Sequence, residues 1–485
     1  MKRIIGLLFQ SIRKVGESRT LVDILITNGF VITMDKGRSI IKEGAVAIED
    51  KAIVDVGKTE DLEKRHSADR TIDAEGGAVL PGFVNVHTHL PSLFVRGVYG
   101  VVTEGLYRIL FPIKRFIEPK DMYTFGLASC LEALNLGSTC IVETYNYLSH
   151  FAKAAEETGI RGVLGEQVAD INYGKLMDGV YEYLPNQGEE MLKRGIRLVE
   201  EWDGRADGRI KTILAPLAPD MCTPETYIEA KEAAERYGRR VTTHLAQSLR
   251  EVKQVKKLYG KTPAQHLRDL GLMTPELSSA HCIHLTDEDM KTVRSSGMGI
   301  LHCPRPYLLN GTTAPLARWM GLGIGVGLGT DNVHHDMFQT MRAALYAARL
   351  RAGSLGEAIS VNRPAFTELL EMATVKGAEV FDLAGEIGSI EVGKKADIIV
   401  VNLCRPHLTP TADVLSSLVL YANGSDVETV IVDGRVVKEG GELTMKGKED
   451  ILARAKELSD GMWSGFWEEN PELKERWEGY LAWRV

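Results

Sequence analysis

Short apolar runs alternate with amphipathic stretches through the middle of the chain, between residues 76 and 386. Each short run is typical of a buried parallel strand. The longer stretches, such as residues 223–237, have the spacing of helices that bury one face. Strands that alternate with helices in this way form parallel sheets or barrels. We therefore predict an α/β fold in which residues 76–386 form a parallel barrel.

The segments on both sides of this region have the pattern of short antiparallel strands. Residues 22–75 alternate apolar and polar positions and contain a turn signal at Asn28-Gly29, and residues 387–442 resume the pattern with an Asp433-Gly434 turn. We expect the two segments to pair into one small β-sandwich domain that is built from both ends of the chain.

The chain ends outside these domains differ in composition. Residues 1–21 carry a short apolar run but no small-residue cleavage site, so we expect an amphipathic extension in preference to an export signal. Residues 443–485 predict a helical extension with four of the six tryptophans: Trp463, Trp467, Trp477 and Trp483. Clustered aromatic side chains usually bury themselves, so we expect this extension to pack on the barrel. A subunit interface or the rim of the pocket is the alternative.

Composition and charge argue against several classes of protein, including those that bind nucleic acid or span a membrane. With 485 residues and 44% hydrophobic side chains, the chain suits a large barrel with an accessory domain. The formal net charge is -8 at pH 7, and the basic residues are dispersed, which argues against nucleic acid as a partner. No apolar run spans a bilayer, and the six scattered cysteines are typical of reduced cytosolic proteins. We expect a cytoplasmic homodimer or higher homo-oligomer that acts on a small molecule, without a membrane partner.

Four of the apolar runs end in side chains that bind metal ions. The first ends in two histidines one residue apart, His87 and His89, and three later runs end in His244, His281 and Asp331. Side chains at i and i+2 of a strand project from the same face, so the first two imidazoles can meet one ion. The carboxyl ends of barrel strands converge on one face, where all five residues would share a pocket. Imidazole and carboxylate ligands suit zinc and similar divalent ions.

The order of these residues resembles the amidohydrolase superfamily. The likeness is to its branch of enzymes similar to cytosine deaminase, S-adenosylhomocysteine deaminase and triazine hydrolase. The segments that carry the resemblance are residues 81–83, 280–285, 327–332 and 388–397, and it extends over residues 22–442. It implies a (β/α)8 TIM-type barrel for residues 76–386.

The resemblance also implies one divalent metal ion per chain, with zinc first and iron, cobalt or manganese as alternatives. The implied ligands are His87, His89, His244 and Asp331. A metal-bound hydroxide would attack the substrate, Asp331 would carry the proton to the leaving group, and His281 would polarise the substrate or orient the hydroxide. A second metal is not expected, because the strand at residues 210–216 has its only lysine, Lys211, at the wrong end.

Two positions depart from the deaminases of this branch. Those enzymes read His-x-x-Glu after the fifth strand, whereas Gln247 follows His244 here, and an amide cannot relay a proton as a carboxylate does. Leu217 stands where nucleoside deaminases carry a histidine. We therefore expect cleavage of an amide, urea, carbamate or thiocarbamate C–N bond in a small neutral or aromatic molecule, as in phenylurea and molinate hydrolases. The alternatives are a deaminase or dechlorinase of a triazine, purine or pyrimidine and, more remotely, an inactive binding protein.

Five side chains are candidates for contact with the substrate. Gln247 would bond the substrate or, equally, fix His244. His302 ends the predicted seventh strand, where relatives place a residue near the pocket. His334 and His335 follow the eighth strand and would line the pocket mouth or be solvated. Arg96, in the loop after the first strand, could hold a substrate carboxylate.

Overall fold

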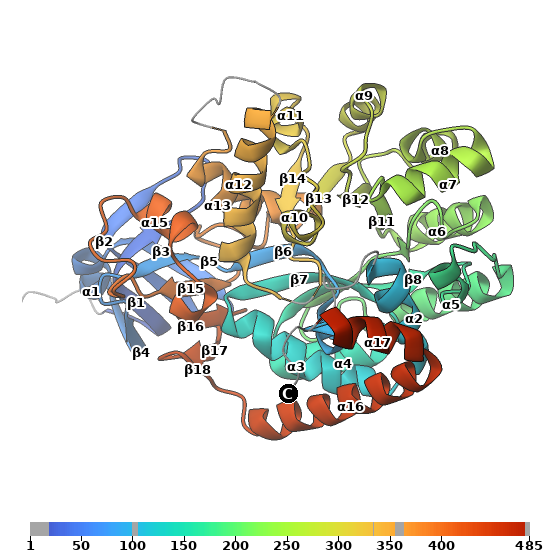
Figure 1. The fold of residues 1–485 in the computed structure, drawn as a ribbon. Coiled ribbons are helices and arrows are strands. Elements are labelled where there is room, and N and C mark those ends of the chain that lie inside the picture. Colours follow the sequence, from blue (N-terminus) through green and yellow to red (C-terminus); the bar gives the residue numbers. More distant parts are fainter. Residues whose placement is uncertain (1–18, 99–104, 333, 355–362, 481–485) are drawn as a thin grey trace, which may run out of the picture.

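The computed structural model describes residues 19–98, 105–332, 334–354 and 363–480, which form a barrel, a sheet domain and a helical extension (Figure 1). The barrel strands are β6 (Phe83–Thr88), β7 (Ser138–Tyr145), β8 (Arg161–Val168), β9 (Ile210–Thr212) with β10 (Ala215–Pro216), β11 (Val241–Leu245), β12 (Leu277–His281), β13 (Gly299–His302) and β14 (Val326–Leu328). All of their ladders are parallel. Nearly every residue in these strands is buried, as expected of a barrel covered by helices.

Two bridges close the barrel. The ladders join β6 to β10 in one sheet and β11 to β14 in another. Leu214 pairs with Val241 at one seam, and Thr88 pairs with Asp331 at the other. The predicted TIM-type barrel is therefore confirmed, and the carboxyl ends of its strands lie on one face.

The helices that surround the barrel follow the predicted amphipathic stretches. They are α3 (Asp121–Asn135), α4 (Leu148–Thr158), α5 (Pro185–Trp202), α6 (Pro224–Tyr237), α7 (Leu249–Tyr259), α8 (Pro263–Asp269), α9 (Asp287–Ser296), α10 (Pro304–Leu309), α11 (Leu316–Gly321), α12 (Met337–Ser354), α13 (Phe366–Met372) and α14 (Val375–Val380). Several begin at a residue whose hydroxyl accepts a backbone N–H of the first turn, such as Thr223 before α6 and Ser248 before α7. These caps fix where each loop on the catalytic face becomes a helix.

The sheet domain contains strands from both ends of the chain. They are β1 (Thr20–Ile32), β2 (Ile40–Glu49), β3 (Ala52–Lys58), β4 (His66–Asp73), β5 (Ala78–Pro81), β15 (Ile398–Val401), β16 (Val427–Val432), β17 (Arg435–Glu439) and β18 (Glu442–Leu443). The short β5 pairs with β1 on one side and β15 on the other. All nine strands therefore belong to one continuous sheet, and the first segment of this domain extends to Pro81 instead of ending at residue 75.

The core of the sheet domain explains why both ends are needed. Buried side chains of the first segment, such as Ile26 and Val46, share one apolar cluster with Ile398 and Ile431 of the second. Neither segment alone could remove its apolar face from water. The helices α1 (Thr59–Arg65) and α15 (Val414–Leu420) complete this part of the chain.

The C-terminal extension forms two helices, α16 (Lys448–Glu469) and α17 (Pro471–Tyr480). The first runs along the barrel beside α3, and the second packs against α16 (Figure 1). The indole of Trp463 donates to the carbonyl of Phe94 at 2.6 Å, and its ring stacks on Trp467, which stacks on Trp477. The extension thus packs on the barrel, as expected. Trp483 and residues 1–18 lie outside the described residues, and the homo-oligomer stays a prediction. None of the helices described combines the length and the apolar character that crossing a membrane requires.

Candidate active site

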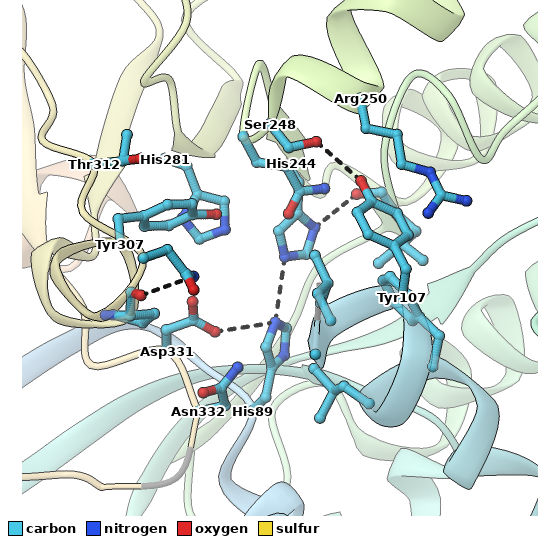
Figure 2. A pocket seen from close by; sticks show the side chains of 18 of the residues that line it. His89, Tyr107, His244, Ser248, Arg250, His281, Tyr307, Thr312, Asp331 and Asn332 are labelled. Atoms are coloured by element: carbon cyan, nitrogen blue, oxygen red, sulfur yellow. Dashed lines mark hydrogen bonds and ion pairs between the residues drawn. The ribbon is translucent and has the colours of Figure 1, made fainter. Parts of the chain in front are cut away.

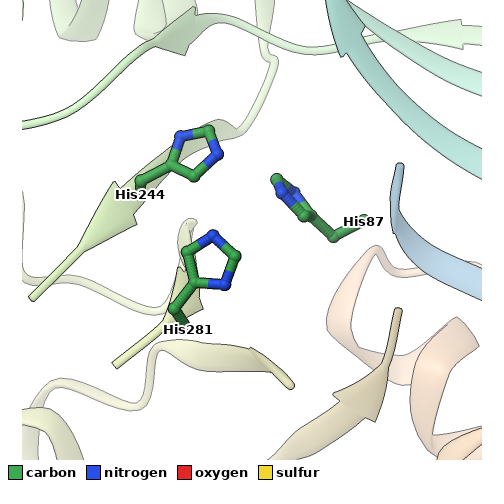
Figure 3. Close-up of side chains that lie close together, drawn as sticks. All are labelled: His87, His244 and His281. Atoms are coloured by element: carbon green, nitrogen blue, oxygen red, sulfur yellow. The ribbon is translucent and has the colours of Figure 1, made fainter. Parts of the chain in front are cut away.

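Four histidines and one aspartate converge at the carboxyl ends of the barrel strands. His87 lies in β6 and His89 just after it, His244 lies in β11, His281 ends β12, and Asp331 follows β14. All five are buried. Figure 3 shows the rings of His87, His244 and His281 directed toward one another, and one nitrogen of each lies within 4.8 Å of the others. The same limit holds for one ligand atom each of His87, His89 and Asp331.

The hydrogen bonds of His89 and His244 leave their Nε2 atoms available as metal ligands. Nδ1 of His89 lies 2.7 Å from the carbonyl of Thr144, and Nδ1 of His244 lies 2.7 Å from the carbonyl of Leu217. A carbonyl only accepts, so each Nδ1 carries the proton and each Nε2 presents a lone pair. These two lone pairs face each other at 3.2 Å. Two nitrogens on one tetrahedral zinc are about 3.3 Å apart, so a shared cation accounts for this geometry.

The imidazoles of His87 and His281 can also bind this cation. Neither ring nitrogen of His87, nor Nδ1 of His281, has a hydrogen-bond partner among the described residues, although both side chains are buried. Burial lowers the pKa of His244 to about 4 and holds the pKa of His87 and His281 well below the usual value. The imidazoles are therefore neutral at pH 7, which is the form that binds metals. We conclude that the site is built to hold a divalent metal ion.

Asp331 is held beside the histidines by the backbone. Its N–H donates to the carbonyl of His87 at 3.0 Å, and its carbonyl accepts from the N–H of His89 at 3.1 Å. Its φ of 62° lies in the left-handed region, a conformation that is uncommon for non-glycine residues. One carboxylate oxygen lies 3.6 Å from Nε2 of His89. Burial raises the pKa of this carboxyl to about 7.

A cavity of about 440 Å³ opens beside this cluster and is shown in Figure 2. Its walls include Leu110 and Phe111, which lie in η2 (Leu106–Leu110) and α2 (Phe111–Ile113) after the first barrel strand. On the opposite side it is lined by Tyr307 of α10. This composition suits a flat neutral ring.

Several polar side chains of the cavity have no signal in the sequence. Lys114 and Gln167 line the cavity beside Tyr145, and the lysine ammonium donates to Oε1 of Gln167 at 2.7 Å. Tyr107 and Ser248 are hydrogen-bonded at 2.9 Å near Arg250, whose guanidinium lies 3.9 Å from the Tyr107 ring centroid (Figure 2). No motif or periodicity marks these residues.

Comparison with known proteins shows the family to which the chain belongs. The sequence profile described as "Amidohydrolase family" matches residues 78–437, about three quarters of the chain. The chain belongs to the amidohydrolase family. It is therefore a hydrolase of carbon–nitrogen bonds other than peptide bonds, as the sequence predicted.

Individual relatives cover nearly the whole amidohydrolase chain. It is 35% identical to a 5'-deoxyadenosine deaminase of Methanosarcina acetivorans over 91% of this chain and 98% of the relative. It is 34% identical to a 5-methylthioadenosine/S-adenosylhomocysteine deaminase of Caldanaerobacter subterraneus subsp. tengcongensis over 92% and 99%. A crystal structure of an adenosine deaminase from Xanthomonas campestris with bound zinc superimposes with a TM-score of 0.83 and 26% identity, over 92% of this chain and all of that one.

The two departures noted in the sequence both lie at the cavity of this amidohydrolase. Leu217 and Gln247 line it, together with His284. The N–H groups of Ala246 and Gln247 donate to the two carboxylate oxygens of the buried Glu251, at 2.7 and 2.8 Å. Glu251 thus shapes the loop after β11 in which Gln247 stands.

The three other candidate histidines do not line the cavity. His302 is buried and packs edge-on against Trp319. His335 is buried, and its Nδ1 lies 3.1 Å from the hydroxyl of Thr330. The carbonyl of His334 accepts a hydrogen bond from Arg305. These three side chains are held away from the cavity by the contacts they make near β13 and β14. Those contacts cannot be read from the sequence.

Arg96 lies away from the metal cluster. Its guanidinium forms an ion pair with Glu132 of α3, and both residues border a groove beside α16 instead of the cavity. The predicted contact between Arg96 and a substrate carboxylate is therefore not supported by its position. The helix η1 (Leu90–Val95) directs the chain outward before Arg96, which explains the difference.

The sequence predicted that the fourth strand lacks a ligand for a second metal ion. Lys211 lies at the start of this strand, and its Nζ pairs with Glu386 at 2.5 Å. The strand ends in Ala215 and Pro216 of β10, which offer no side-chain ligand. Among the described residues, the groups that could hold a metal ion include no carboxylate of this strand, and the single metal ion stays a prediction.

Burial of Lys114 predicts a pH-dependent stability. Burial lowers the pKa of its ammonium to about 7, although Glu143 and Glu166 act in the opposite direction. The unfolded chain keeps this proton up to about pH 10.4. Unfolding therefore takes up a proton between about pH 7 and 10, and this contribution makes the folded state more stable as the pH rises.

The variant Lys114→Met tests this contribution. Without metal and at pH 7, we expect it to be more stable than the wild type by about 2–4 kcal/mol, because it no longer buries a charge. The difference should disappear toward pH 10. Urea unfolding at pH 7, 8.5 and 10 measures it, and a difference that is constant with pH would contradict the burial argument.

Proposed function

We propose that this amidohydrolase is a deaminase of an adenosine-type nucleoside, from which it releases the exocyclic amine as ammonia. The observation that carries the proposal is the similarity, over almost their full length, to enzymes named 5'-deoxyadenosine and 5-methylthioadenosine/S-adenosylhomocysteine deaminases. This favours the deaminase alternative over the amide or urea cleavage that Gln247 and Leu217 suggested.

The cavity supports a substrate of this kind. Its volume of about 440 Å³ lies within the range of small-molecule sites. Phe111, Tyr145 and Tyr307 offer aromatic faces against which a purine can stack. Ser248 and Tyr107 offer hydroxyl groups that can bond ribose oxygens. The pocket therefore combines an apolar slot for a base with a polar region for a sugar.

We further propose zinc as the divalent ion, held by His87, His89, His244 and Asp331, with His281 beside it. A solved relative of similar fold contains zinc, and the donor set of imidazoles and one carboxylate is typical of this ion. When bound, such an ion supplies the Lewis acidity that makes water a nucleophile near neutral pH.

The protein side chains would move the protons of the reaction. Asp331 can take a proton from the attacking water and pass it to the substrate ring, and it can then carry the second proton of that water to the departing amine. His281 can donate a hydrogen bond to the substrate from the other side of the cluster. Gln247 cannot transfer a proton, and the buried His281 is neutral at pH 7. The Gln247 amide would therefore bind an edge of the base, while Asp331 protonates the ring.

Turnover on a defined panel tests the function. The zinc-loaded wild type is expected to release ammonia from 5'-deoxyadenosine, 5-methylthioadenosine or S-adenosylhomocysteine, with the absorbance change of an adenine converted to a hypoxanthine. Phenylureas, carbamates and thiocarbamates should give no amine or thiol. Efficient cleavage of a urea or carbamate without nucleoside deamination would restore the expectation drawn from the sequence.

A further inference from the structure

Lys114 is a buried ammonium that the proposed reaction leaves without a role. It begins η3 (Lys114–Phe116), its exposed fraction is 7%, and it lines the cavity. Its hydrogen bond to Gln167 uses one of three N–H groups. Within the described ranges, Lys114 forms no ion pair with a carboxylate. A buried charge with unused donors is costly unless a further acceptor is present.

Aromatic rings stabilise this charge without satisfying its donors. The ammonium nitrogen lies 4.3 Å from the ring centroid of Tyr145, 5.5 Å from that of Phe111 and 5.6 Å from that of Tyr173. Ring faces attract a cation but are weak hydrogen-bond acceptors. Tyr145 also lines the cavity, and its buried hydroxyl has no hydrogen-bond partner in the part of the chain that the structure describes. Two unused donor groups thus border the same side of the cavity.

The position of the ammonium is fixed relative to the metal cluster. Nε2 of Gln167 donates to the carbonyl of Thr144 at 3.1 Å, and Nδ1 of His89 donates to the same carbonyl at 2.7 Å. Lys114 is therefore connected to His89 through two rigid, buried hydrogen-bonded groups. A ligand atom bound to the ammonium would be held in a defined place relative to the reacting centre.

We propose that Lys114 is a substrate-binding residue that donates a hydrogen bond to an acceptor nitrogen in the ring of the bound nucleoside. This inference rests on the nucleoside function proposed above and names a residue that selects the substrate. The adenine ring offers lone pairs at N1, N3 and N7, which match the unused donors of the ammonium. The charge also disfavours cationic substrates, which would face it at short range. The Lys114 contact thus requires a ring that carries an acceptor.

Ring analogues that lack one nitrogen identify the contact. The values of kcat/KM are measured for 5'-deoxyadenosine and its 3-deaza and 7-deaza analogues, and inhibition constants for the 1-deaza analogue, with zinc-loaded wild type and Lys114→Met. The wild type is expected to discriminate about 10- to 100-fold against one analogue, the usual effect of a hydrogen bond to a charged group. Lys114→Met should lose this discrimination and keep the preferences against the other two.

Two further variants control the experiment. Lys153 of α4 lies 5.3 Å from the Tyr123 ring centroid on the exposed surface, so Lys153→Met removes a lysine from an aromatic ring without touching the cavity. It should behave as the wild type. Lys114→Arg keeps charged donors and should retain part of the discrimination. Should Lys114→Met not fold, Lys114→Gln enters the same comparison, with an expected discrimination below tenfold.

The outcomes separate this inference from the proposed function. Deamination by the wild type, with equal discrimination in the wild type and the Lys114 variants, overturns the Lys114 contact and leaves the deaminase function intact. Binding of nucleosides without ammonia release removes the deaminase function. The same comparison of dissociation constants by calorimetry then supports or overturns the contact. Absence of both binding and turnover overturns both.

Discussion

Replacement of His244 by Ala is expected to remove the metal ion and turnover together. His244 presents its Nε2 to Nε2 of His89 at 3.2 Å, and its Nδ1 is fixed on the carbonyl of Leu217. Loss of a partner that merely orients a ligand costs about 10- to 100-fold in metal affinity or activity, so loss of the ligand itself should exceed this range. Metal content after dialysis, together with nucleoside turnover, measures the effect.

His150 offers a matched control for this variant. It is an exposed histidine of α4, so His150→Ala removes an imidazole without affecting the cavity. This control should keep one metal ion per chain and the wild-type rate. Full metal occupancy in His244→Ala would show that the ion is held by other residues, and the ligand set would then have to be rebuilt around His87 and His281.

The second large effect is expected for Asp331→Asn. Asparagine preserves the shape of the side chain but cannot carry a proton between the attacking water and the leaving amine. The rate should fall by about 10²- to 10⁴-fold, which is the usual contribution of a general acid or base. Circular dichroism should show the wild-type fold, because the backbone hydrogen bonds of residue 331 to His87 and His89 do not depend on its side chain.

Asp170→Asn serves as the control for Asp331. Asp170 is a buried carboxylate that accepts hydrogen bonds from Thr223 and Thr226 at the start of α6, and it does not line the cavity. Its replacement should affect stability more than the rate. A near-normal rate in Asp331→Asn would instead assign the proton transfer to another group, with His281 as the next candidate.

The sequence by itself determined the barrel and the residues at its catalytic face. Apolar runs long enough for one buried strand, separated by amphipathic stretches, leave few alternatives to parallel strands covered by helices. Since the carboxyl ends of such strands meet on one face, His87, His244, His281 and Asp331 could be assigned to one pocket before any contact was known. Each of these residues stands at or near the carboxyl end of its strand. Because the strands are parallel, their carboxyl ends lie on the same face of the barrel, and the residues meet there.

The tertiary structure alone decided which other side chains reach that pocket. Lys114 stands in a loop segment without a distinctive pattern, and Tyr145 and Gln167 lie near the ends of β7 and β8 without a motif that marks them. Only the folded chain shows that all three line the cavity. Arg96 and His302 were also predicted to contact the substrate, yet their side chains contact Glu132 and Trp319 instead. The direction of a loop side chain depends on neighbours distant in the sequence, whereas the identity of a strand depends mainly on its own residues. For this reason the metal cluster could be predicted from the sequence and the substrate-binding wall could not.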